Sequence, residues 1–256
     1  PPAPQPDRIV LNVTEDPATS IAVNWRTCDT VRTGFIEIAP VSADPRTVSK
    51  ATRRPATSEA FRLEDIAATY HSVTVPGLTP STVYMYRVGQ GAYWSEWFHT
   101  RTAGKPGDKL SFIYLGDAQV GLKTLWPRVI RAAYAKMPEA NLILYAGDIV
   151  NRGNNDSEWG ELFYGGGFIH STIPGMHSPG NHEYARTGDT LSAFWRPQFS
   201  LPENGPEGLK ESCYYTDVQG MRFISINSYR VEESDEDMRK QKVWVDSLLR
   251  NNPNRW

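Results

Sequence analysis

Two stretches of the chain decide the fold of its C-terminal half. Residues 110–119 read Leu-Ser-Phe-Ile-Tyr-Leu-Gly-Asp-Ala-Gln, and residues 141–148 read Asn-Leu-Ile-Leu-Tyr-Ala-Gly-Asp. Each contains an apolar run that ends in Gly-Asp, which is typical of a strand buried on both faces of a parallel sheet. Between them, apolar residues at helical spacing predict a helix: Leu125, Val129, Ala132, Ala133 and Met137. The pattern therefore predicts a strand, a helix and a second strand, which is an α/β arrangement.

This order places two aspartates at one edge of the predicted sheet. A helix that connects two parallel strands brings their C-terminal ends to the same side, where open α/β sheets bind ligands. Asp117 and Asp148 directly follow the glycines that end the two runs, so we expect them to lie close together. A third motif, Gly-Asn-His-Glu at residues 180–183, follows a further predicted short strand and adds Asn181 and His182 to this edge.

The side chains at this edge suit a pair of divalent cations. Carboxylate and amide oxygens bind hard cations, and two cations about 3.5–4 Å apart can hold a phosphate and activate a bridging hydroxide. The motifs therefore indicate metal-dependent hydrolysis of phosphate esters. His182 is a candidate for orienting the phosphate or protonating the leaving group, and Arg152 for a forked contact with the phosphate oxygens.

The N-terminal half carries short alternating strands separated by turns. Alternation predicts strands at residues 9–13, 21–25, 34–38, 70–75, 83–88 and 94–100. Strands at this spacing indicate an antiparallel sandwich. A turn-rich segment then marks a boundary. We predict a sandwich over residues 1–103, a linker over 104–109 and the α/β domain over 110–256.

Further elements are predicted towards the C-terminus. The sequence indicates a helix near residues 158–163 and a hairpin over 213–227 that turns at Gln219-Gly220. The acidic run 232–237 is predicted to be a solvated loop or the start of a helix. The last predicted helix has these apolar residues: Val243, Trp244, Leu248 and Leu249.

Composition excludes several classes of protein. Apolar residues make up 39% of the chain and charged residues 22%, so the chain is globular rather than disordered. The net charge is −2 and there is no Lys/Arg block, so we expect no nucleic-acid-binding patch. No apolar stretch approaches the ~20 residues of a membrane helix. The proline-rich start without Met is compatible with an exported protein that is secreted, periplasmic or on the cell surface, although it does not establish export. Cys28 and Cys213 could form a disulfide or remain buried thiols.

Together the motifs resemble a known family. Residues 116–117, 147–153 and 180–183 are similar to the first three signatures of calcineurin-like metallophosphoesterases. Residues 77–88, Gly-Leu-Thr-Pro-x-Thr-x-Tyr-x-Tyr-x-Val, resemble part of a fibronectin type III-like domain in which Tyr84 forms the tyrosine corner. The whole chain resembles a purple acid phosphatase-like protein. This resemblance implies a fibronectin-like β-sandwich followed by a four-layer α/β (α+β) phosphoesterase domain.

The resemblance also implies metal ligands. Asp117 would bind the first metal, Asp148 would bridge the two metals, Asn181 would bind the second, and His182 would face the substrate. Many relatives have His two residues after the first Asp, where this chain has Gln119, whose side-chain oxygen could bind a hard cation.

One departure from the family concerns the identity of the metals. Purple acid phosphatases have a metal-binding Tyr three residues after the bridging Asp, where this chain has Asn151. A coloured Fe(III) centre is therefore not expected. Mn, Fe(II), Zn and Mg are all candidates for the two cations.

The histidine ligands of the family are missing. They come from two later signatures, whereas His71 and His99 belong to the sandwich and His170 and His177 fall at no family position. We therefore expect the chain to be incomplete at its C-terminus, with the other half of the site supplied in cis or by a separate chain. Without that half, sheet edges and apolar surface would be exposed.

Two functions of different classes are compatible with these features. The first is a phosphomonoesterase or phosphodiesterase that acts on a phosphate-ester small molecule or a phosphorylated substrate. The alternative is a non-catalytic extracellular binding or adhesion module with a degenerate phosphoesterase domain. The five motif residues that remain intact favour the enzyme: Asp117, Asp148, Arg152, Asn181 and His182.

Overall fold

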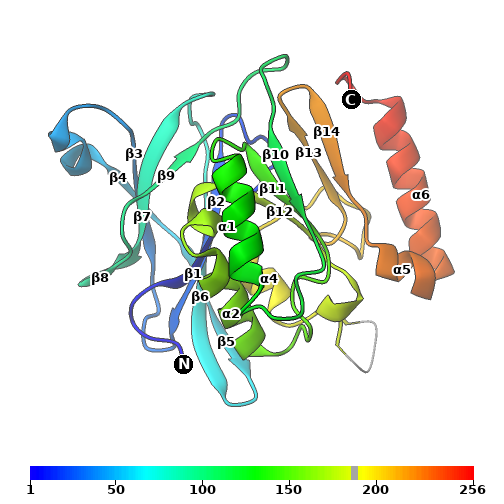
Figure 1. Ribbon diagram of the computed structural model, residues 1–256, viewed down its shortest axis with the longest axis horizontal. Helices are drawn as coiled ribbons and strands as arrows, with labels where there is room; N and C mark the ends of the chain where they lie inside the picture. The colour runs from blue at the N-terminus through cyan, green and yellow to red at the C-terminus, as the bar shows by residue number, and fades with distance from the viewer. Residues whose placement is uncertain (186–189) are drawn as a thin grey trace.

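The structure is a computed structural model that describes residues 1–185 and 190–256 (Figure 1). An antiparallel β-sheet domain comes first and a mixed α/β domain follows, so the predicted fold class is confirmed. Across the described residues, no helix is both long enough and apolar enough to cross a membrane.

The N-terminal domain is a sandwich of two sheets. Its strands are β1 (Asp7–Asn12), β2 (Ile21–Cys28), β3 (Phe35–Pro40), β4 (Thr52–Pro55), β5 (Thr57–Leu63), β6 (Ile66–Val75), β7 (Val83–Gln90), β8 (Tyr93–Trp94) and β9 (Phe98–Arg101). One sheet has the order β1-β2-β6-β5, and the other has the order β4-β3-β7-β8 with β9 also paired to β7. Leu11, Trp25 and Tyr86 are buried in the apolar core of the sandwich. The predicted tyrosine corner is confirmed, since the Tyr84 hydroxyl accepts a hydrogen bond from the Thr79 amide at 2.9 Å.

Two strands of the sandwich were not predicted, and one prediction joined two strands. β4 has four exposed residues and β5 is largely polar, so neither shows an alternating apolar pattern. The predicted strand 94–100 is split between β8 and β9. Ser95 lies at the break, where its hydroxyl accepts a hydrogen bond from the Val88 amide at 3.1 Å.

The α/β domain contains the predicted crossover unit. Its first elements are β10 (Phe112–Leu115), α1 (Trp126–Lys136), β11 (Leu142–Ala146), α2 (Asp156–Gly166), α3 (Ile169–Thr172) and β12 (Gly175–Ser178). The three strands are parallel and adjacent in the order β10-β11-β12. All three therefore end at the same edge of the sheet.

The buried face of α1 differs from the prediction by one residue. Trp126 and Ile130 are buried, whereas Leu125 and Val129 are 55% and 50% exposed. A second helical stripe beginning at Trp126 competes with the predicted one. The bulky indole buries the larger area, and its Nε1 donates a hydrogen bond to the Leu162 carbonyl at 3.2 Å.

The C-terminal part forms a short helix, a hairpin and two further helices (Figure 1). Its elements are the short helix α4 (Trp195–Gln198), β13 (Tyr214–Val218), β14 (Met221–Ser225), α5 (Ser228–Glu233) and α6 (Asp235–Arg250). The hairpin turns at Gln219 and Gly220, as predicted, and both have positive φ. The acidic run does start a helix. Val243 and Leu249 are exposed, however, because α6 buries Asp237 and Gln241 instead.

The two domains share one sheet. β1 pairs in parallel with β12, and the Val13 amide donates to the Gly175 carbonyl at 3.0 Å. The strands therefore form a seven-stranded sheet in the order β10-β11-β12-β1-β2-β6-β5. The predicted linker is also fastened, since the Gly104 amide donates to Gln219 Oε1 at 2.9 Å.

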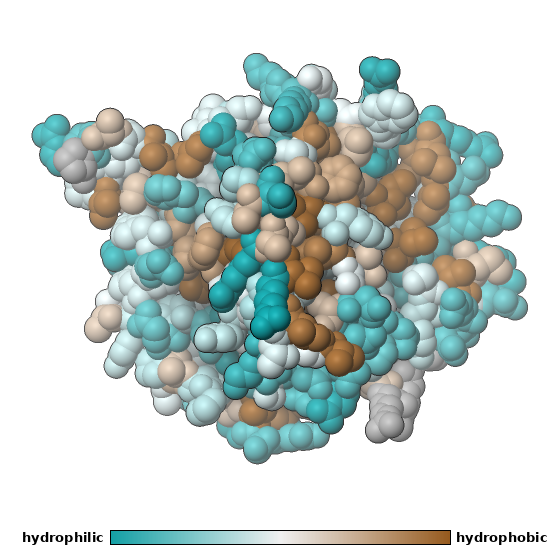
Figure 2. Space-filling model, in the orientation of Figure 1, coloured by the Kyte–Doolittle hydropathy of each residue, from teal (hydrophilic) through white to brown (hydrophobic). Residues whose placement is uncertain are grey.

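The first strand of this sheet is an exposed edge. β10 ends the sheet, and its Tyr114 is 67% exposed. Figure 2 shows hydrophobic residues at the surface beside α1, where Leu125 and Val129 are among the exposed apolar side chains of the described residues. Cys28 and Cys213 are both free thiols rather than a disulfide; Cys213 is buried as predicted, whereas Cys28 is only partly buried.

Candidate metal centre

The loops that follow β10 and β11 run side by side. The Asp117 amide donates to the Gly147 carbonyl at 3.0 Å, and the Gln119 amide donates to the Asp148 carbonyl at 3.1 Å. The two aspartates thus meet at the carboxyl edge of the sheet, although a whole helix separates them in sequence.

Both aspartates adopt a strained backbone conformation. Asp117 has φ of 57° and Asp148 has φ of 50°, a region that residues with a Cβ rarely enter. Such strain gathers at functional sites, where the surrounding structure over-determines it. It is the first sign in the structure that this edge is more than a pair of turns.

The third motif packs directly against Asp148. A Cβ on Gly147 would lie 2.8 Å from the Gly180 nitrogen, and a Cβ on Gly180 would collide with the Asp148 carboxylate. Only glycine permits this close approach of the two loops. The His182 amide donates to Asp148 Oδ1 at 3.1 Å, which places the exposed Asn181 beside the carboxylate.

A backbone carbonyl fixes the ring of His182. Its Nδ1 lies 2.7 Å from the Asn151 carbonyl oxygen, so this nitrogen carries a proton and donates. The hydrogen bond selects the tautomer and leaves Nε2 as the nitrogen that can act on a ligand. His182 is half-buried at this edge of the sheet.

Gln119 is turned towards Asp117. Its Nε2 donates to Asp117 Oδ1 at 2.6 Å. Its Oε1 is buried and has no hydrogen-bond partner within the described part of the chain. An orphaned buried oxygen beside a carboxylate suits a cation ligand, so the structure is compatible with the predicted role of Gln119.

Glu183 connects two of the loops, a role that the sequence did not reveal. The side chain is fully buried, and Oε1 accepts from the Ile149 and Val150 amides at 2.8 and 3.1 Å. Oε2 accepts from the Asp148 and Gly180 amides at 2.9 and 2.8 Å. Burial raises the pKa of Glu183 to about 7, although these amides favour the carboxylate form. An acidic residue directly after His182 was the available signal.

Arg152 is held by the first turn of α2. Its backbone amide and Nε donate to Glu158 Oε2 and Oε1, at 2.7 and 2.8 Å. The side chain is 64% exposed. A forked contact with a phosphate would therefore have to use its two terminal nitrogens.

The other four histidines lie away from the three loops. His71 is buried between Thr27 and Ser58 in the sandwich, and His99 is an exposed residue of β9. His177 is buried and stacks between the rings of Tyr145 and Phe199. His170 is buried beside Tyr145, and burial lowers its pKa to about 4. Such an environment favours neutral core residues.

The oxygen donors fit one side of a metal site. Carboxylate, carboxamide and the orphaned Gln119 oxygen are hard ligands that suit divalent cations. Over residues 1–185 and 190–256, however, no cluster of three or more His, Cys, Asp or Glu side chains could hold a metal ion.

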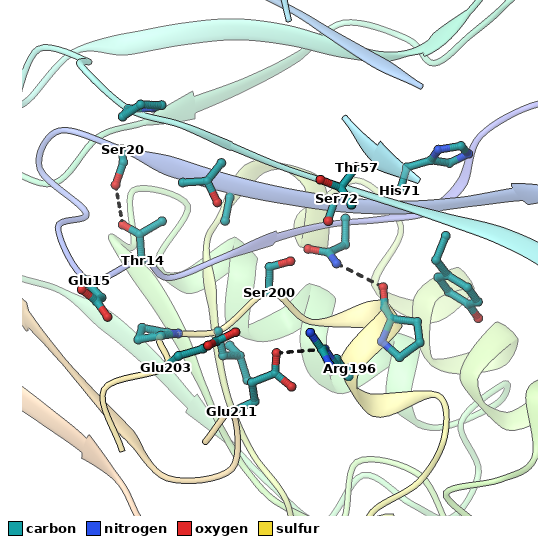
Figure 3. Close-up of a pocket in the computed structure, with 18 of the residues that line it drawn as sticks. Thr14, Glu15, Ser20, Thr57, His71, Ser72, Arg196, Ser200, Glu203 and Glu211 are labelled. Carbon is teal, nitrogen blue, oxygen red and sulfur yellow. Dashed lines mark hydrogen bonds and ion pairs between the residues drawn. The ribbon is translucent and has the colours of Figure 1, made fainter. Parts of the chain in front are cut away.

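A cavity of about 660 Å³ lies elsewhere, between the sandwich sheet and the segment that follows α4 (Figure 3). In Figure 3, Thr57, His71 and Ser72 lie on the strands, opposite Arg196 and Glu211. None of the predicted site residues lines the cavity. The cavity is lined by a single arginine and by five carboxylates, which disfavours a phosphate ligand. The carboxylates are those of Glu15, Asp16, Glu59, Glu203 and Glu211.

Glu211, which lines this cavity, is predicted to make the stability of the fold depend on pH. Burial, with Glu203 and Glu59 nearby, raises the pKa of Glu211 to about 7 despite Arg196 at 3.6 Å. The unfolded chain loses this proton first as the pH rises from 4.5, so the folded protein loses stability up to about pH 7. We expect Glu211→Gln to remove about 1–2 kcal/mol of this loss after a discount for solvent screening.

Melting curves measure this effect. The Tm of Glu211→Gln minus that of the wild type should be ~2–6 °C larger at pH 8 than at pH 4.5. Glu207→Gln is the control, because the Glu207 side chain is 89% exposed and its substitution should cause no such change. A Glu211→Gln difference that does not vary with pH would contradict the assignment.

The fold and the paired aspartates define a two-domain chain of the metallophosphoesterase class. The profile of the purple acid phosphatase N-terminal domain matches residues 6–102, and that of the calcineurin-like phosphoesterases matches residues 110–256. The chain therefore belongs to the calcineurin-like phosphoesterase family, as the sequence motifs predicted.

Solved structures show the same fold. Purple acid phosphatase PPD1 from yellow lupin (Lupinus luteus) seeds is 18% identical, with a TM-score of 0.74 over 96% of this chain and 48% of that one. PhoD is 14% identical, with a TM-score of 0.55 over 86% of this chain and 51% of that one. The chain thus spans about half the length of these two proteins. No curated protein matches the chain.

Proposed function

We propose that this chain carries the oxygen-ligand side of a dinuclear site that hydrolyses phosphate esters. The observation that carries the proposal is the meeting of three loops at one sheet edge, with Asp117 and Asp148 in strained conformations and His182 bonded to Asp148. Family membership supports the class of reaction.

Each side chain has a proposed task. Asp117, Asp148 and Asn181 would hold two divalent cations, with Gln119 as a further oxygen ligand. When bound, the cations supply Lewis-acid activation and neutralise charge on the phosphate. His182 would present Nε2 to the phosphate or the leaving group.

The remaining ligands would come from outside residues 1–256. Mn, Fe, Zn and Mg are each compatible with the oxygen ligands. If the remaining ligands are nitrogen atoms, they would narrow the choice among these four metals. We propose that they are contributed in cis or by a separate chain, since the described histidines other than His182 lie away from the three loops.

Removal of the metal tests the proposal. We expect the full-length protein to hydrolyse para-nitrophenyl phosphate or bis-para-nitrophenyl phosphate, and chelation to lower the rate on the order of 10³-fold. Adding back one of the four metals after dialysis should restore the activity, which is followed by release of nitrophenol. If none of them supports hydrolysis of either ester, the non-catalytic binding module becomes the better account.

A further inference from the structure

A buried group of charges joins the sandwich to the first turn of α2. The Arg8 and Arg26 side chains are only 4% and 5% exposed, and both reach Asp156 Oδ1, at 2.7 and 2.8 Å. Arg26 also donates two hydrogen bonds to the Asp7 carboxylate, at 2.9 and 2.7 Å, in a bidentate arrangement. Two negative charges thus match two positive ones, as buried charges require.

The backbone of β1 bends to bring Arg8 into this group. The pairing of β1 with β2 shifts register between Asp7 and Val10, and Arg8 has φ of 50° within the shift. A bulge of this kind re-aims a side chain, and a non-glycine residue in this conformation costs energy. Arg8 also donates to the Asp156 carbonyl at 2.7 Å and to Gln198 Oε1 at 3.2 Å. These two hydrogen bonds and the ion pair between Arg8 and Asp156 all cross the domain boundary.

Asp156 is directly connected to the loop of the candidate site. It is the first residue of α2, and the same helical turn carries Glu158, which holds Arg152 through the two hydrogen bonds described above. One residue further on, Trp159 Nε1 donates to the Gly153 carbonyl at 2.6 Å. The first turn of α2 therefore fixes the position of the loop that contains Arg152 and Gly153.

His182 depends on the same loop. The Gly153 amide donates to the His182 carbonyl at 2.9 Å, and the Asn151 carbonyl accepts from the His182 ring. Displacement of α2 would therefore move the ring that is proposed to face the substrate.

We propose that Arg8 and Arg26 are positioning residues for the catalytic site. By fixing Asp156 they set the first turn of α2, and through it residues 148–153 and His182. This inference rests on the proposed function and extends it, since it makes the sandwich part of the catalytic unit. The sandwich then contributes to kcat without touching substrate.

Asp156→Asn in the full-length protein tests this inference. The substitution keeps the shape of the side chain and removes the charge that holds both arginines. We expect kcat for the nitrophenyl ester to fall by ~10–100-fold, with KM changed by less than ~3-fold, because misplacement by about 1 Å can cost that much.

A matched control lies in the other sheet of the sandwich. Glu37 on β3 is 13% exposed, compared with 17% for Asp156, and it likewise pairs with two arginines, Arg53 at 2.6 Å and Arg87 at 2.7 Å. Glu37→Gln should leave kcat within about twofold of the wild type at a temperature where both proteins are folded. An equal loss of kcat in both variants would overturn the inference.

Hydrogen exchange provides a readout that needs no activity. We expect the Gly153, Asn155 and Trp159 amides to exchange at least ~10-fold faster in Asp156→Asn and to be unchanged in Glu37→Gln. Unchanged exchange in Asp156→Asn would overturn the inference. A wild type without hydrolytic activity would instead overturn the proposed function. If Asp156→Asn does not fold, Arg26→Lys keeps the charge but loses the bidentate arrangement, and it should lower kcat in the same direction.

Discussion

Asp148→Asn is expected to reduce hydrolysis of the nitrophenyl ester on the order of 10³-fold, equivalent to about 4 kcal/mol. The amide oxygen of Asn can still accept the hydrogen bond that the His182 amide gives to Asp148 at 3.1 Å. The three loops should therefore keep their places, while the negative charge proposed to bridge the two cations is lost. The rate of nitrophenol release at saturating metal measures the effect.

The control for this variant is an aspartate outside the site. Asp217 pairs with Arg222 on the hairpin at 2.7 Å, and its side chain is 33% exposed. Asp217→Asn should lower stability slightly and leave kcat unchanged. Full activity of Asp148→Asn with a normal metal content would remove Asp148 from the mechanism.

Glu183→Gln is expected to destabilise the fold by about 3 kcal/mol, because the new NH₂ group would face two buried amides that have lost their acceptor. That corresponds to a fall in Tm of ~6–12 °C for a domain of this size. The wild-type carboxylate satisfies four backbone amides from two loops, so metal affinity should fall together with stability. Calorimetry at pH 8, where the carboxylate form predominates, measures the change.

The pH of this experiment matters. Burial raises the pKa of Glu183 to about 7, so the unfolded chain loses this proton first as the pH rises from 4.5, and the folded wild type loses stability up to about pH 7. Since Glu183→Gln has no such titration, its loss of stability relative to the wild type should be larger at pH 5 than at pH 8. An unchanged Tm at pH 8 would show that the carboxylate does not hold the loops together.

The sequence predicted the order of elements better than their faces. Apolar runs that end in Gly-Asp located β10 and β11, because a doubly buried strand has few alternatives. The predicted face of α1 was wrong at Leu125 and Val129, and the burial of Gln241 in α6 was not predicted, because side-chain packing and polar docking decide which residues are buried. Trp126 and Gln241 are buried through contacts with distant segments, which local periodicity does not contain.

The candidate site, too, could be predicted only in part from the sequence. Asp117, Asp148 and His182 could be placed together from the crossover rule and from motif order alone. Glu183 and Asp156 could not, because their importance lies in hydrogen bonds to backbone amides and in an ion group that crosses the domain boundary. No pattern of residue types in one sequence encodes such partners.

Asp117, Asp148 and Asn181 are proposed to hold two cations. Anomalous diffraction from crystals of the full-length protein grown with Mn²⁺ tests this proposal most directly. We predict two peaks about 3.5–4 Å apart, with Asp148 in contact with both, Asp117 with one and Asn181 with the other. A fully loaded protein with no anomalous peak within bonding distance of Asp148 would contradict the account.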